Sequence, residues 1–424
     1  MKTTALRIHG KNDLRLDTFD LPEPKEDEIL AEVVTNSICM SCHKAAILGP
    51  EHKRVPKDVD VNPTIIGHEF AGVLRWVGPR WADKFKVGQK FSIQPALGYK
   101  GSLDAPGYSF RTIGGMASFI VIPSMVMEQD CLLPYGGDGF FKASLSEPMS
   151  CIVGAAHAEF HTKYGSYKHT MGIQRRGECA LLAAAGPMGL GFVDYLTHGP
   201  RKPKLLVVTD IDQARLDRAA QWMTVEDAKK NGVKLLYVNT ASVPNPVEYL
   251  RGLTQKAEGF DDVFVLAPVP PVIEQGDDIL RRNGCLNFFA GPTKTDFKAR
   301  FNFYNVHYGE THIIGTSGGN TDDMRESLQL MGENKVNPAV MVTHIAGITA
   351  GADTILRLPE IPGGKKLVYT QCDFPLTALA DLDKAGQANP VFATLAEICR
   401  RNKDLWSVEA EEYLLANAPK YRPI

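Results

Sequence analysis

One short stretch, Cys179–Gly191, limits the fold more than any other part of the chain. Its apolar run Ala180–Ala183 is typical of a strand buried on both faces of a parallel sheet, and the turn Gly186–Gly189 precedes a segment with helical spacing. A second apolar run, Lys204–Thr209, ends at Asp210, 21 residues after the last glycine of that turn. Strand, glycine-rich turn, helix, strand and acid, in this order, favour a dinucleotide site over an ordinary turn that contains glycines.

Dinucleotide chemistry gives each residue of this segment an expected role. Gly186 lets the backbone approach a pyrophosphate, Gly189 lets helix and strand pack closely, and the helix N-terminus holds the phosphate charge. Asp210 is expected to bind the ribose hydroxyls and so to favour NAD(H), whereas Arg215 could swing toward a 2′-phosphate and keeps NADP(H) open. Ala184 replaces the first glycine of the fingerprint. The predicted cofactor-binding residues are Ala184, Gly186, Pro187, Met188, Gly189, Asp210 and Arg215.

Length and composition narrow the class of protein. A chain of 424 residues exceeds what one core usually serves, so two domains are expected. The net charge of −2 argues against nucleic acid as a partner. No apolar run reaches the ~18 residues of a membrane span, and the first residues lack the apolar core of a signal peptide. A cytoplasmic protein with no membrane partner is therefore expected. Eight scattered cysteines do not resemble a disulfide framework.

The order of elements predicts how the two domains share the chain. The first 150 residues read as mostly β, with a helix near 143–160, and residues 153–317 alternate strand with helix. That alternation predicts an α/β domain with a doubly wound parallel sheet. We expect residues 1–152 and 318–424 to form the other domain. The tail from residue 374 reads as packing helices, with Asn389 and Ser407 as N-caps.

Four residues outside the dinucleotide segment form a candidate metal site. Cys39, His68, Glu69 and Glu147 would together supply a thiolate, an imidazole and one or two carboxylates, a set that suits tetrahedral zinc with an exchangeable position. Zinc is useful beside a nicotinamide because it is a Lewis acid without redox chemistry of its own.

Cys42 forms a Cys-x-x-Cys pair with Cys39 and leaves alternatives open. A redox pair is expected at a helix start beside a strand–helix–strand unit, whereas this pair lies in the β-rich first part of the chain, which disfavours that interpretation. A bond from Cys42 to zinc is a further alternative.

The motifs taken together resemble the zinc-dependent medium-chain dehydrogenase/reductase superfamily. The resemblance runs from about residue 5 to 370 and rests on Cys39-x-Ser41, Gly67-His68-Glu69-x-x-Gly72, Gly78, Gly88, Glu147-Pro148-Met149-Ser150 and the nucleotide fold near residue 180. It implies a GroES-like, mostly β catalytic domain made by both chain ends, with a Rossmann domain inserted between them. The Glu-Pro-Met-Ser segment is similar to the sorbitol dehydrogenase branch.

Carried over by position, the resemblance assigns roles to single residues. Cys39 and His68 match zinc ligands, Glu69 matches a third ligand or close neighbour, and Glu147 matches a fourth ligand that exchanges with water and is counted with the catalytic residues. Ser41 matches the catalytic hydroxyl that relays the substrate proton. The cysteine-rich structural zinc lobe of some relatives is absent, so one zinc per chain is expected.

The chain departs from the family pattern at several places, one of them Lys44, where the family relay often ends in a histidine. Cys42 stands where the family usually has an aspartate that orients the histidine ligand. The Arg-Tyr pair that contacts polyol in sorbitol dehydrogenases has no counterpart around Thr316. The overall pattern is most similar to L-sorbose 1-phosphate reductases, which implies hydride transfer between NAD(P)(H) and a sugar or polyol phosphate, with L-sorbose 1-phosphate reduced to D-glucitol 6-phosphate.

Several alternatives stay open at this point. One is a dehydrogenase of unphosphorylated polyols or other secondary alcohols. A zinc-free quinone reductase of the same fold and a catalytically silent nucleotide-binding sensor are two others, and the intact metal set argues against both. Lys44, Arg111 and the amides of Gly318-Gly319 are candidates for holding a substrate phosphate. A homo-oligomer, dimer or tetramer, is expected.

Overall fold

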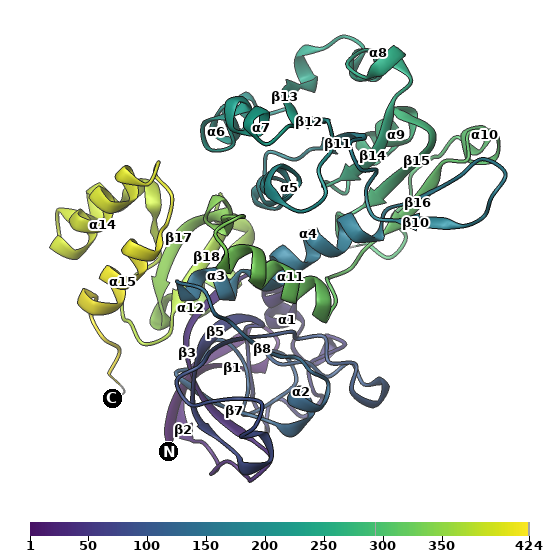
Figure 1. Ribbon diagram of the computed structural model, residues 1–424. Helices are drawn as coiled ribbons and strands as arrows, with labels where there is room; N and C mark the ends of the chain where they lie inside the picture. The colour runs from purple at the N-terminus through teal and green to yellow at the C-terminus, as the bar shows by residue number, and fades with distance from the viewer. Residues whose placement is uncertain (293, 423–424) are drawn as a thin grey trace. The chain divides into compact units, whose positions relative to one another are not determined.

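The structure is a computed structural model that describes residues 1–292 and 294–422, and it divides into two compact units (Figure 1). Unit 1 consists of Met1–Glu147, Asn320–Glu333 and Val342–Ile424, and unit 2 of Pro148–Gly319 and Asn334–Met341. Residues 334–341, which the sequence groups with the C-terminal part, thus belong to unit 2. A hydrogen bond ties this segment to unit 2, since the Asn337 amide donates to the buried carboxylate of Asp194 at 2.5 Å.

Unit 2 is built on the predicted parallel sheet, which the structure confirms. Its six strands lie in the order β13-β12-β11-β14-β15-β16, and every neighbouring pair is parallel. All five residues of β11 are buried, as expected of a strand covered on both faces. The strands are β11 (Glu178–Leu182), β12 (Leu205–Asp210), β13 (Lys234–Asn239), β14 (Phe260–Val265), β15 (Leu280–Phe288) and β16 (His312–Gly315).

Helices connect these strands, and a short antiparallel pair precedes them. The helices are α5 (Pro187–His198), α6 (Gln213–Trp222), α7 (Val225–Lys230), α8 (Pro246–Gly252), α9 (Pro270–Asp278) and α10 (Phe303–Tyr308), and the pair is β9 (Phe160–Thr162) with β10 (His169–Met171). Helix α4 (Ser146–Ala158) spans the change from unit 1 to unit 2. No helix within the described residues is both long and apolar enough to cross a bilayer.

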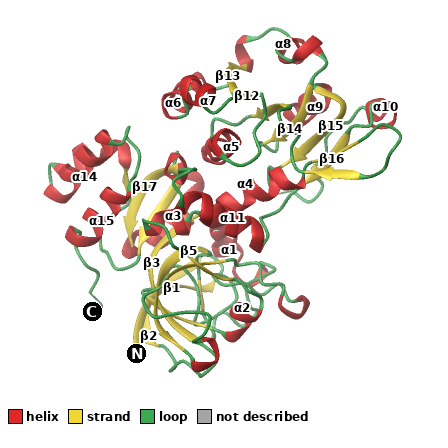
Figure 2. Ribbon diagram, in the orientation of Figure 1, coloured by secondary structure: helices red, strands yellow, loops and turns green. Residues whose placement is uncertain are grey.

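Unit 1 is mostly strand and loop (Figure 2). Its main sheet has the order β19-β17-β18-β3-β5-β6-β8 with β7 on β3, and a smaller sheet has the order β2-β1-β4. Its strands are β1 (Lys2–Gly10), β2 (Asp13–Asp20), β3 (Ile29–Ile38), β4 (Thr64–Ile65), β5 (Glu69–Val77), β6 (Lys90–Ile93), β7 (Phe119–Ile122), β8 (Leu132–Pro134), β17 (Val342–Gly347), β18 (Lys365–Tyr369) and β19 (Thr377–Ala378). Its helices, besides those of the tail, are α1 (Met40–Leu48), α2 (Ser124–Glu128), α3 (Phe140–Ser144), α11 (Thr321–Gly332) and α12 (Gly351–Leu356).

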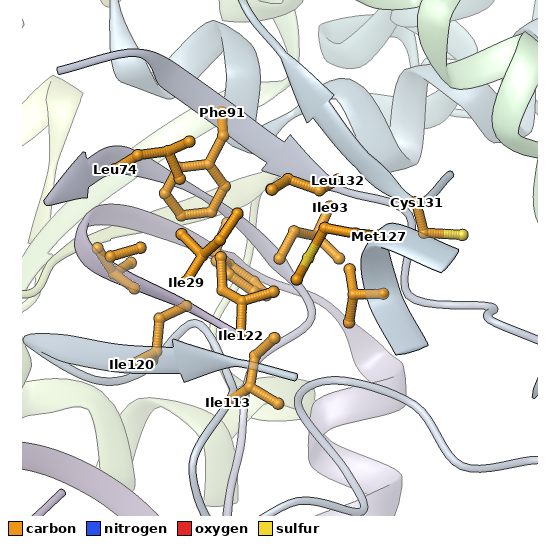
Figure 3. Packing of buried hydrophobic residues seen from close by; sticks show 14 of the residues in the cluster. Ile29, Leu74, Phe91, Ile93, Ile113, Ile120, Ile122, Met127, Cys131 and Leu132 are labelled. Atoms are coloured by element: carbon orange, nitrogen blue, oxygen red, sulfur yellow. The ribbon is translucent and has the colours of Figure 1, made fainter. Parts of the chain in front are cut away.

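A dense apolar cluster holds the strands of unit 1 together (Figure 3). Ile29 from β3, Leu74 from β5, Phe91 from β6 and Ile120 from β7 meet in it, and each is at most 1% exposed. Burying a side chain of this size contributes about 1.5–3 kcal/mol to stability. A shift of one residue in the pairing of these strands would move such side chains out of the core, so their burial favours the observed register.

The tail of the chain packs on unit 1 as helices α13 (Leu382–Gly386), α14 (Pro390–Arg401) and α15 (Val408–Asn417). The two predicted N-caps are confirmed, because Asn389 accepts from the Val391 amide and Ser407 from the Ala410 amide.

A buried carboxylate fastens this tail. Glu411 is 1% exposed and accepts hydrogen bonds from the Phe140 amide at 2.5 Å, the Phe141 amide at 2.8 Å and the Tyr369 hydroxyl at 2.9 Å. The Trp406 indole donates to the same hydroxyl at 2.8 Å. The last helix therefore caps α3, which leads into the segment that carries Glu147.

Candidate metal centre and dinucleotide site

The register of β3 and β5 brings the first two candidate ligands together. Ser37 pairs with Glu69 in this antiparallel ladder, so Cys39, just beyond β3, and His68, just before β5, emerge at the same end. Gly67, directly before His68, has φ of +99°, and a side chain there would meet Asn36 and Met116. The Cys39 sulfur lies 3.3 Å from His68 Nε2.

Cys39 is also the N-cap of α1, which places Ser41 and Cys42 in the first turn of that helix. Ser41 Oγ lies 3.3 Å from Cys39 Sγ, and Cys42 Sγ lies 3.5 Å from His68 Nδ1. Cys42 thus contacts the second nitrogen of His68, the contact expected of the family aspartate. The pair does stand at a helix start, contrary to the sequence-based expectation, but that helix belongs to no strand–helix–strand unit of a parallel sheet.

Glu69 is already engaged by an ion pair. Both of its carboxylate oxygens contact Lys365 Nζ, at 2.6 and 2.7 Å, and Ser37 Oγ donates to one of them. The side chains of Glu69 and Lys365 are only 2% and 9% exposed. Strand β18 lies beside β3 in the sheet, with Leu367 opposite Ser37, and this pairing brings Lys365 to the site.

Glu147 completes the candidate centre from the first turn of α4. One ligand atom from each of His68, Glu69 and Glu147 lies within 4.8 Å of the others, and the same holds for Cys39, Cys42 and His68. Both groups contain His68, which is therefore common to the two sets of candidate ligands.

The charges of this cluster favour a metal-binding state of Cys39. A hydrogen bond from Cys42 lowers the pKa of Cys39 well below its usual value, against the effect of burial and together with the charge of His68. The same hydrogen bond and burial raise the pKa of the Cys42 thiol well above its usual value. Burial lowers the pKa of His68, but Cys39, Glu147 and Glu69 outweigh burial and raise it to about 9. These opposite shifts favour a thiolate on Cys39 and a neutral thiol on Cys42, and a thiolate is the form of cysteine that binds metal.

The donor set fits zinc on geometric grounds. Tetrahedral zinc with bonds of about 2.3 Å to sulfur and 2.0 Å to nitrogen separates these two atoms by about 3.5 Å. The observed separation of Cys39 Sγ and His68 Nε2 is 3.3 Å. Sulfur, imidazole and carboxylate donors at this spacing suit one zinc ion.

The glycine-rich segment of unit 2 leaves open space at the start of α5 and brings that helix close to the preceding turn. Gly186 is the N-cap of α5, and the space where its Cβ would lie is open. Pro187 and Met188 form the first turn of that helix. A Cβ on Gly189 would lie 1.8 Å from the carbonyl oxygen of Ala184, so only glycine fits there.

Asp210 is buried at the end of β12, where the sequence predicts the ribose-binding acid. Its Oδ1 accepts from the Ile211 and Asp212 amides at 2.9 and 3.1 Å, and its Oδ2 accepts from the Ala185 amide at 3.1 Å. The carboxylate therefore also holds the backbone on both sides of the site, at Ala185 and at Ile211-Asp212. Of its two oxygens, Oδ2 accepts one hydrogen bond and Oδ1 two, so Oδ2 has more capacity for a further hydrogen bond. Arg215 lies close by but pairs with Asp212, with Nε 3.4 Å from Oδ2.

Sequence reasoning missed several residues of the metal site. Tyr108, from the long loop before β7, stacks on the His68 ring at 4.8 Å and places its hydroxyl 3.4 Å from Nε2. Lys365 and Arg54 also lie at or beside the site. No periodicity or motif marks these three residues, since strand pairing and loop packing alone bring them in.

Comparisons with known proteins place the chain among dehydrogenases and reductases. Residues 206–333 match the family described as zinc-binding dehydrogenase. The chain is 49% identical to the mannitol-1-phosphate 5-dehydrogenase of Aliivibrio fischeri over 98% of its own length and 97% of the relative. It is also 49% identical to the L-sorbose 1-phosphate reductase of Klebsiella pneumoniae over 98% of both chains. A zinc-binding dehydrogenase from Sinorhizobium meliloti, solved with NADP, shares the fold with a TM-score of 0.68 and 17% identity, covering 87% of this chain and all of the other.

Proposed function

The chain belongs to the zinc-dependent medium-chain dehydrogenase/reductase superfamily, and on that premise we propose that it interconverts L-sorbose 1-phosphate and D-glucitol 6-phosphate. It is an oxidoreductase of the zinc- and NAD(P)-dependent type that acts on sugar or polyol phosphates. The observation that carries this function is 49% identity over almost the whole chain to two sugar-phosphate enzymes.

Cys39, His68 and Glu147 would hold the zinc ion, which when bound supplies a Lewis acid to the substrate oxygen. Glu69 then acts as a close neighbour, because Lys365 and Ser37 already engage its carboxylate. We expect one zinc per chain by elemental analysis, lost in Cys39→Ala. Two zincs per chain, or full activity of that variant, would contradict this assignment.

Ser41 is the proposed proton relay. Its hydroxyl lies 3.3 Å from Cys39 Sγ, at the edge of the donor set, and it can accept the proton of the substrate alcohol and pass it on. In the direction of reduction, the same hydroxyl returns a proton to the substrate oxygen.

The segment Gly186–Gly189 is proposed to bind the dinucleotide, which supplies or accepts the hydride. Asp210 favours NAD(H), since a buried carboxylate accepts from ribose hydroxyls and repels a 2′-phosphate. Arg215 would have to leave Asp212 to accommodate NADP(H). Comparison of kcat/KM for both cofactors tests this preference.

The choice of substrate rests on where the phosphate lies. The names of the two relatives place it differently: next to the carbonyl carbon of a 2-ketose in L-sorbose 1-phosphate, but four carbons from the oxidised carbon in mannitol 1-phosphate. A paired assay of L-sorbose 1-phosphate and mannitol 1-phosphate, with free sorbose and sorbitol as controls, decides between these two positions of the phosphate. Equal use of free and phosphorylated sugars would leave an ordinary polyol dehydrogenase.

A homo-oligomer is proposed from the edge of the parallel sheet. Strand β16 is the last strand of that sheet, and Ile313 on it is 39% exposed. The nearby sequence of α10 exposes Phe303, Tyr304 and Tyr308 by 63–73%. Light scattering after gel filtration distinguishes a dimer or tetramer from a monomer.

A further inference from the structure

Arg54 presents a buried donor close to the metal centre. Its Nε is shielded from solvent and has no hydrogen-bond partner among the described residues. A buried donor without an acceptor is costly, and more so on a charged group. The guanidinium carbon lies 5.4 Å from the centre of the Tyr108 ring. The group is thus held in place by an aromatic contact, while a donor on it lacks an acceptor.

Tyr108 links this guanidinium to the candidate ligands. Its ring stacks on His68 at 4.8 Å between centroids, and its hydroxyl lies 3.4 Å from His68 Nε2. Burial raises the pKa of Glu147, and the charge of Arg54 is among the groups that oppose the rise. Arg54 therefore lies close enough to the candidate ligands for its charge to act on Glu147.

The loop that carries Arg54 is fixed against the loop that carries Tyr108. Ser109 Oγ donates to the Arg54 carbonyl at 2.7 Å and accepts from the Ala105 amide at 3.0 Å. The Arg54 amide in turn donates to His52 Nδ1 at 3.3 Å, which leaves the proton of a neutral His52 on Nε2. The His52 ring is nearly parallel to that of Tyr108, at 5.6 Å. Two donor side chains, on a loop that is hydrogen-bonded to the Tyr108 loop, therefore lie beside this tyrosine.

We propose that Arg54, assisted by His52, binds the phosphate group of the substrate. This inference rests on the proposed function, since it names the group that recognises a sugar phosphate. A guanidinium offers a planar fork of N–H donors that matches a phosphate monoester, and it stays charged at every physiological pH.

The candidates singled out from the sequence fit this role less well. Arg111 is exposed and donates to Asn62 at 3.0 Å, and it has a like-charged neighbour in Arg7. Gly319 packs against the backbone of Ser150, where a Cβ would lie 2.3 Å from the carbonyl oxygen. Lys44 lies close enough to act on the charge of His52, so it adds positive potential to the proposed subsite.

The test compares Arg54→Gln with the matched control Arg111→Gln. For each holoenzyme, kcat/KM is measured on sorbitol 6-phosphate and on sorbitol, and the value for the phosphate is divided by the value for the free polyol. Each hydrogen bond to a charged group contributes a factor of about 10 to 150 to this ratio. The loss of two should lower the ratio about 10²–10⁴-fold in Arg54→Gln and leave it within about threefold in Arg111→Gln. Arg54→Lys, which keeps the charge without the fork, should lie between wild type and Arg54→Gln.

Binding of inorganic phosphate gives a second measurement that does not depend on turnover. Millimolar phosphate should raise the melting temperature of wild type and of Arg111→Gln, but not of Arg54→Gln. If wild type itself does not prefer the phosphorylated substrate, the proposed function fails. If wild type prefers it and both Arg54 variants keep the full ratio and the phosphate-induced shift, the function stands and this subsite is wrong.

Discussion

Replacing Lys365 by methionine tests how the ion pair beside the metal centre is held. Lys365 Nζ lies 2.6 and 2.7 Å from the two oxygens of Glu69, and both side chains are buried. Methionine keeps most of the apolar stem but removes all three donors, so Glu69 retains only Ser37. Removing one partner of a buried ion pair costs about 3–5 kcal/mol, because the other charge remains buried. For a domain of ~150–250 residues, this cost lowers the melting temperature by about 6–20 °C.

Thermal unfolding near pH 8, after removal of metal by a chelator, measures this cost without a contribution from bound zinc to the melting temperature. Lys365→Arg is the matched control, since it keeps a cation and should retain most of the stability. The double variant Lys365→Met with Glu69→Gln removes both charges and should recover much of the loss, and comparison with both single variants, Lys365→Met and Glu69→Gln, isolates the energy of the pair. A cost below about 1 kcal/mol for Lys365→Met, or no recovery in the double variant, would refute the reasoning.

Three further predictions concern single residues. Ser41→Ala should lower kcat about 10²–10⁴-fold with zinc content unchanged, and an unchanged kcat excludes Ser41 from the proton path. Asp210→Ala should narrow or reverse the preference for NAD(H) over NADP(H) in kcat/KM. It should also lower the melting temperature, because three backbone amides lose the acceptor of their hydrogen bonds. An unchanged cofactor preference together with an unchanged melting temperature would contradict this role of Asp210. Burial raises the pKa of Glu411 from 4.5 to about 7, so the folded state favours the protonated side chain. The free energy of unfolding therefore has its full contribution from Glu411 below pH 4.5, and it falls by about 3 kcal/mol as the pH rises through 7. Glu411→Gln should flatten this dependence in denaturant titrations at pH 5 and pH 8, and an unaltered dependence would contradict the assignment.

The parts of the fold that follow from local rules were predictable from the sequence. The run of apolar strands and the turn Gly186–Gly189 predicted a parallel sheet, because period and glycine placement are properties of neighbouring residues. The structure has that sheet, and Gly189 has no room for a Cβ. Asn389 and Ser407 were predictable as caps for the same reason.

The long-range partners of the site were not predictable in this way. Glu69 and Lys365 are separated by 296 positions, and only the lateral order of β18, β3 and β5 brings them together. Tyr108 and Arg54 reach the site from irregular loops, where no hydrophobic period constrains a side chain. The sequence likewise predicted that Asp210 lies at the end of a strand, but not that three backbone amides donate hydrogen bonds to its carboxylate.

Cys42 changes the number of charges around the metal loop. Members of the superfamily usually carry aspartate at this position, whereas burial and its hydrogen bond to Cys39 raise the pKa of the Cys42 thiol and keep it neutral. Exchange of a carboxylate for a neutral thiol beside His68 therefore removes one negative charge that would repel a dianionic substrate, and it leaves every proposed zinc ligand in place.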